Sequence, residues 1–139
     1  MVARNLTGIV VAAILASAAP ALAQSPEDAA QRAAEQWLAL VDGAQYTASW
    51  EQAASIFKNA VTASQWEQAV TRARQPFGPF KSRKVTSRKA STTLPGAPDG
   101  QYVVVVFDSA FERKAAAVET AVMMLDTDGV WRVSGAFIR

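Results

Sequence analysis

The sequence contains neither cysteine nor histidine among its 139 residues. Without cysteine it can form no disulfide bond and carries no thiolate nucleophile. Without histidine it lacks the usual imidazole general base and the nitrogen ligands that zinc prefers. These absences exclude a large share of enzyme chemistry, and we expect no metal site, no cofactor and no catalytic residue of a common type.

Net charge is also low, since 14 Lys and Arg residues stand against 12 Asp and Glu residues and half of the chain is apolar. This composition is typical of one small globular domain.

The first 23 residues have the pattern of a secretory signal peptide. Arg4 supplies a positive charge, residues 6–19 are uncharged and mostly apolar, and Ala21-Leu22-Ala23 has the small-x-small pattern of a signal-peptidase site. An uncleaved anchor is the alternative, but polar residues interrupt the stretch and no basic stop-transfer flank follows it. We expect a cleaved signal, a domain over residues 24–139 with no transmembrane segment, and a periplasmic or secreted location.

The first half of that domain predicts three helices. The first starts at Ser25-Pro26-Glu27-Asp28, which joins an N-cap serine to a proline and acids in the first turn, and it stops at Gly43. The second covers about residues 47–58, and the third runs from the capping box at Thr62 to about Arg74. We expect three tryptophans on these helices to pack in the core: Trp37, Trp50 and Trp66.

The second half predicts strands. Residues 81–93 lack an apolar stripe and indicate an exposed edge strand, whereas residues 102–107 form a continuous β-branched run that is typical of a strand buried on both faces. Residues 118–125 and 130–138 predict the last two strands, and Trp131, Val133 and Phe137 are expected to share the core face.

Two segments permit alternatives. Residues 110–125 fit either a helix, because their apolar residues keep a heptad spacing, or a strand. Asp126-Thr127-Asp128-Gly129 has the opening of a calcium loop but lacks its third acid and distal glutamate, so we expect a hairpin turn.

Five segments, in this order, resemble the DUF4019 family of exported bacterial proteins: WLALVDG (37–43), YTASW (46–50), FKSR (80–83), LPGAPDG (94–100) and WRVSG (131–135). The resemblance covers nearly all of the mature domain. It implies a strand at residues 115–125, a domain boundary and no catalytic residues, because the family has no assigned function. A broader likeness is to the NTF2-like or cystatin-like cone, in which helices pack on a curved antiparallel sheet.

Positive charge is concentrated between Arg72 and Lys89, where no acid occurs. Strand alternation would put Lys81, Arg83 and Lys89 on one face and Lys84 and Arg88 on the other. One interpretation is an edge strand that charge protects from aggregation. The other is a binding site for an anionic component of the cell envelope or an acidic protein, formed by Lys81, Arg83, Lys84, Arg88 and Lys89. Nucleic acid is not expected as a partner, because no aromatic residue interleaves the basic residues.

Catalysis would have to rely on carboxylates and tyrosines. Asp108 or Glu119 could act as a general base beside Tyr46 or Tyr102, provided that they converge in a pocket.

We therefore expect an α+β domain with three N-terminal helices packed on a four-stranded antiparallel sheet. The predicted function is an exported non-enzymatic binding or assembly module, and the alternative is an NTF2-like small-molecule enzyme with a carboxylate general base.

Overall fold

The computed structural model describes residues 18–20 and 22–139. The predicted signal peptide therefore lies largely outside the described residues. Within the described part, no helix combines the length and the apolar composition that crossing a membrane requires.

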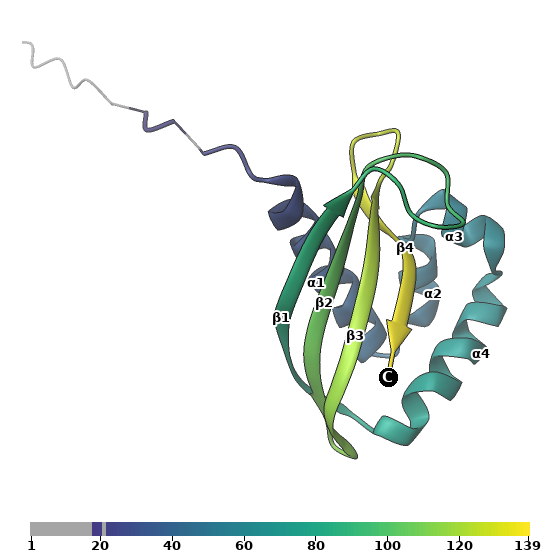
Figure 1. Cartoon of the computed structure of the whole chain (residues 1–139). Helices are drawn as coiled ribbons and strands as arrows, with labels where there is room; N and C mark the ends of the chain where they lie inside the picture. The colour runs from purple at the N-terminus through teal and green to yellow at the C-terminus, as the bar shows by residue number, and fades with distance from the viewer. Residues whose placement is uncertain (1–17, 21) are drawn as a thin grey trace, which may run out of the picture.

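The chain folds into helices followed by a four-stranded antiparallel sheet, which is the predicted α+β class (Figure 1). The helices are α1 (Pro26–Asp42), α2 (Tyr46–Glu51), α3 (Ser55–Ala60) and α4 (Ala63–Arg74), followed by the 3₁₀ turn η1 (Gln75–Phe77). The strands are β1 (Phe80–Ser91), β2 (Tyr102–Phe111), β3 (Lys114–Leu125) and β4 (Trp131–Ile138), and they lie in the order β1-β2-β3-β4. Residues 114–125 are thus a strand rather than part of a helix.

Local signals determine where the helices begin. The Ser25 side chain accepts a hydrogen bond from the backbone N–H of Asp28 at 3.1 Å. Thr62 and Gln65 form both hydrogen bonds of a capping box at the start of α4.

The predicted second helix is two short helices instead of one. Between them the backbone of Ala54 is extended, and its N–H donates to the carbonyl of Val133 in β4 at 2.8 Å. Ala53 and Ala54 are buried at this break. A tertiary hydrogen bond has therefore replaced the helical one.

The core lies between α1 and one face of the sheet, which we call the inner face. The buried side of α1 includes Ala34, Trp37 and Val41, and it packs against inner-face residues such as Val105 and Phe107. The opposite, outer face has no helix over it (Figure 1). The β2 run is therefore buried on one face only, since Val103 and Val105 are buried whereas Val104 and Val106 are partly exposed.

Two β-bulges change which side chains reach the core. One lies in β1 between Val85 and Ser87, and the other shifts the pairing of β4 with β3 beside Val122. The prediction that Phe137 faces the core is wrong for this reason, because the second bulge turns Phe137 to the outer face, where it is 66% exposed.

Candidate functional site

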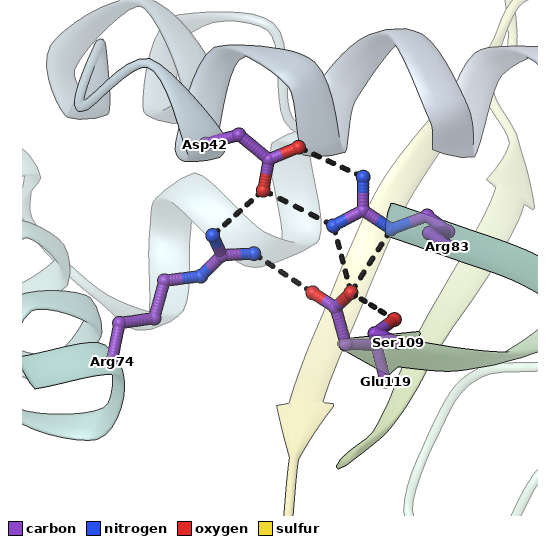
Figure 2. Close-up of polar contacts among 5 residues, drawn as sticks. All are labelled: Asp42, Arg74, Arg83, Ser109 and Glu119. Carbon is purple, nitrogen blue, oxygen red and sulfur yellow. Dashed lines mark hydrogen bonds and ion pairs between the residues drawn. The ribbon is translucent and has the colours of Figure 1, made fainter. Parts of the chain in front are cut away.

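Four charged side chains form a closed ring where the helices meet the inner face (Figure 2). Arg74 donates to Asp42 at 2.7 Å and to Glu119 at 2.8 Å. Arg83 spans the same two acids, with hydrogen bonds of 2.8 Å to Asp42 and 2.7 Å to Glu119. Ser109 adds a hydroxyl that donates to Glu119 at 2.5 Å. We call these five residues the charge ring.

The charge ring joins segments that are distant in the sequence. Asp42 ends α1, Arg74 ends α4, Arg83 lies in β1, Ser109 in β2 and Glu119 in β3. Arg74 suits its position, because the negative end of the helix dipole favours a cation. Asp42 does not suit the end of α1, and the two arginines compensate for this unfavourable placement.

The ring is largely closed to solvent, with its four charged side chains between 3% and 13% exposed. Burial by itself lowers the pKa of the Arg83 guanidinium, but hydrogen bonds and charge from Asp42 and Glu119 outweigh it and raise that pKa. Arg83 also lies over the Phe80 ring, 4.2 Å from its centroid. Two positive and two negative charges cancel, so the ring is a neutral structural clamp.

The five basic residues predicted on β1 do not form one patch. Pairing with β2 puts Arg83 opposite Ser109 and Arg88 opposite Val105, both of which are inner-face positions. Arg88 pairs with Asp28 of α1. The predicted division of the strand is therefore wrong, because the bulge between Val85 and Ser87 reverses the alternation and puts both arginines on the helical side.

The three lysines of β1 remain exposed. Lys84 pairs with Asp108 and Lys89 with Val104 in the register, which are outer-face positions, and Lys81 lies at the bulge that opens the strand. None of the ion pairs found in the described residues involves these lysines.

The outer face beside these lysines is apolar at its centre. Phe137 is the most exposed large hydrophobic side chain on the sheet, and it lies over Gly135, where an added Cβ would be 3.7 Å from the ring. Phe137 lies in the edge strand β4, and four partly exposed valines lie on the same face of the two central strands, β2 and β3: Val104, Val106, Val118 and Val122. We call Lys81, Lys84, Lys89, these valines and Phe137 the outer patch.

The residues considered for catalysis do not converge. Asp108 is exposed on the outer face, whereas Glu119 is buried on the inner face with both oxygens occupied by the charge ring. Tyr102 is buried beneath the loop that precedes β2, and its hydroxyl donates to the Pro98 carbonyl at 2.6 Å. Tyr46 lies on α2, in the helical layer.

The acids of the β3–β4 turn bind an arginine. Arg132 pairs with Asp126 at 3.0 Å and with Asp128 at 2.8 Å. The side-chain hydrogen bond from Arg132 lowers the pKa of the Asp128 carboxyl to about 2. The turn is thus the expected hairpin connection, and Gly129 has a φ of 78°, which favours glycine.

Sequence reasoning missed Asp42, Arg74 and Ser109 as members of one cluster. One signal was available for Asp42, because the last turn of α1 carries an acid and no basic residue, against the preference of the helix dipole. Partners on four other elements could not be identified from local pattern.

The model of a protein family described as "Protein of unknown function (DUF4019)" matches residues 33–136. No curated protein matches the chain.

Proposed function

The chain belongs to the DUF4019 family, which has no assigned activity, and we therefore propose its function from its own surfaces. We propose an exported, non-enzymatic binding module whose outer patch docks on an anionic lipid surface of the cell envelope. The observation that carries this proposal is the register of β1. It turns Arg83 and Arg88 toward acids of the helical layer and leaves Lys81, Lys84 and Lys89 exposed beside apolar side chains.

The charges of the outer patch suit an anionic surface. Each lysine near such a surface contributes about 1 kcal/mol, so three lysines contribute about 3 kcal/mol at low ionic strength. Burial of the Phe137 ring in the interface adds an apolar contribution. The sum corresponds to weak, reversible and salt-sensitive binding.

The shape of the outer face favours lipid over an acidic protein. Residues that dominate protein interfaces fill well-packed pockets. The outer face instead has an open hollow of about 480 Å³, bordered by Ser82, Lys84 and Asp108. Such a hollow has room for a lipid headgroup whose phosphate lies beside the Lys84 ammonium and the Ser82 hydroxyl and away from the Asp108 carboxylate, which repels it.

A binding role is favoured over catalysis by the state of the carboxylates. A general base needs an unoccupied oxygen within reach of a substrate proton. Both oxygens of Glu119 accept hydrogen bonds from arginines, and Asp108 is an exposed carboxylate on the other face.

The proposal is tested by co-sedimentation with vesicles. We expect the mature chain, residues 24–139, to bind vesicles rich in phosphatidylglycerol and not vesicles of pure phosphatidylcholine, and to dissociate at about 1 M salt, where charges are screened within about 3 Å. The double variant Lys84→Glu/Lys89→Glu is expected to bind at least about tenfold more weakly, since a loss of 1.4 kcal/mol is a tenfold change.

The matched control is Lys58→Glu/Arg72→Glu, which makes the same change of net charge on the helical layer. Equal losses in the two double variants would point to net charge alone and refute the outer patch. Equal binding to both kinds of vesicle would also refute the proposal, as would binding to polyglutamate but not to lipid.

A further inference from the structure

A second surface lies on the helical side of the sheet, in a groove between α4 and the inner face of β3 and β4. Its volume is about 240 Å³. Its lining includes Trp37 and Val41 of α1, Trp66 and Ala69 of α4, and Phe137 and Ile138 of β4. We call it the α4 groove.

The two indoles beside the α4 groove are fixed by Ser49. The indole N–H of Trp37 donates to the Ser49 carbonyl at 2.8 Å, and that of Trp66 donates to the Ser49 hydroxyl at 2.9 Å. Ser49 is fully buried, and the two ring centroids lie 5.5 Å apart. The polar edges of both rings are therefore satisfied within the protein, and the aromatic wall exists before any ligand arrives.

The charge ring borders the same groove. Arg74 and Glu119 contribute to the groove lining and are paired with each other at 2.8 Å. Because the charge ring is already neutral, a charged ligand would add an uncompensated charge to a partly desolvated site. An uncharged ligand avoids this cost.

Size limits the ligand further. One turn of a helix is about 10 Å across with its side chains and about 5.4 Å long, so it takes up more space than the 240 Å³ of the groove. An apolar cavity of about 150 Å³ can hold benzene, so the groove volume suits a body of about two fused rings.

We infer that the α4 groove binds a small, uncharged molecule with a flat apolar ring system. The partly exposed Trp66 ring supplies stacking, the buried Trp37 ring behind it adds apolar contact, and the charge ring sets the spacing of α4 from the sheet. This inference rests on other observations than the outer patch, namely the aromatic side chains and the neutral charge ring of the helical side, and Phe137 is the one outer-patch residue that also borders the groove.

The test is an NMR titration of the full chain with 2-naphthol, which is uncharged at neutral pH, and with 2-naphthoate, its anionic counterpart. We expect 2-naphthol to cause saturable shifts of the indole N–H signals of Trp37 and Trp66, while the signal of Trp50 stays in place. We expect 2-naphthoate to bind at least about tenfold more weakly.

A variant with a larger side chain in the α4 groove shows whether 2-naphthol binds there. Ala69→Phe puts a ring into the groove and is expected to weaken 2-naphthol binding at least about tenfold, whereas Ala39→Phe, on the exposed side of α1, is expected to have no effect. Ala73→Leu fills the same groove with a smaller side chain and serves if Ala69→Phe does not fold. The absence of saturable shifts would refute the inference. So would shifts that persist in a folded filling variant, or equal affinity for 2-naphthoate.

Discussion

Arg74 of α4 and Glu119 of β3 are joined by a 2.8 Å ion pair although 45 residues separate them. The pair links the end of α4 to the inner face at the border of the α4 groove. It also makes Glu119 a structural carboxylate, which accepts hydrogen bonds from two arginines and one serine.

Loss of the Glu119 charge should destabilise the fold strongly. Glu119→Gln keeps the shape of the side chain but leaves two buried guanidinium groups facing only one acid. Breaking a buried ion pair by removing one partner costs about 3 to 5 kcal/mol. We expect the free energy of unfolding, measured with urea, to fall by about 3 kcal/mol or more. Asp108→Asn changes an exposed acid on the neighbouring strand and should cost less than about 0.5 kcal/mol; similar losses for both variants would contradict the structural role of the charge ring.

The planar guanidinium group of Arg83 should stabilise the fold through its geometry as well as through its charge. Arg83 bridges Asp42 and Glu119 with several hydrogen bonds, which a lysine ammonium cannot reproduce with the same geometry. We expect Arg83→Lys to lower the free energy of unfolding by about 1 to 3 kcal/mol. Arg88→Lys is the matched control on the same strand, because Arg88 makes one exposed ion pair, and it should cost less than about 1 kcal/mol. Equal effects would mean that charge alone accounts for the role of Arg83.

The Ser49 hydroxyl should control the position of Trp66. Ser49→Ala removes the acceptor of the Trp66 indole N–H at a buried site, which costs about 1 to 3 kcal/mol. We expect a lower free energy of unfolding together with a shifted indole N–H signal for Trp66. The Trp37 signal should shift less, since Trp37 donates to the Ser49 backbone carbonyl, which the substitution retains. Ser64→Ala, at an exposed position of α4, should change neither quantity, and a stable Ser49→Ala variant with an unmoved Trp66 signal would contradict the prediction.

Low pH should destabilise the β3–β4 turn, because it protonates the Asp128 carboxylate. Its carboxyl has a pKa of about 2 in the folded protein against an ordinary value of 3.8, because Arg132 donates a hydrogen bond to it. A lowered folded-state pKa contributes stability above the ordinary value, and this contribution is lost as pH falls toward the folded-state value. We therefore expect Asp128→Asn to have a lower Tm than the parent at pH 6, with a difference that shrinks between about pH 4 and pH 2.

The control for this effect is Thr127→Asn, which changes the same turn without removing a titratable group. Its Tm difference from the parent should not depend on pH in the same interval. Thermal unfolding followed by circular dichroism measures both differences, and a pH-independent effect of Asp128→Asn would contradict the assignment.

Several features of this protein were determined by short stretches of sequence. The Ser25 cap and the Thr62 capping box identify helix starts correctly, because each signal depends on residues within one turn. For the same local reason, the turn around Asp99 separates β1 from β2 and the turn around Asp128 separates β3 from β4. These signals locate most of the elements, but the local pattern of residues 110–125 fits a helix as well as a strand, and it was the family resemblance that favoured the strand.

The orientation of side chains was decided by the tertiary structure. Bulges in β1 and β4 insert one residue into the pairing, which reverses the alternation beyond that point. Arg88 thereby reaches Asp28 of α1, and Phe137 faces solvent. Nothing in the local pattern of either strand marks the inserted residue, because the bulge is a property of the pair of strands.

The sequence by itself determined that positive charge gathers between Arg72 and Lys89 and that no acid lies within that segment. Only the tertiary structure decided which of these charges neutralise one another. The charge ring brings together residues of α1, α4 and three strands, and their proximity depends on how the helical layer packs on the sheet. Arg74 and Arg83 thus belong to the charge ring and Arg88 pairs with Asp28, whereas Lys84 and Lys89 lie on the outer face. Burial of Arg74 and Arg83 requires carboxylates that only the folded chain brings beside them.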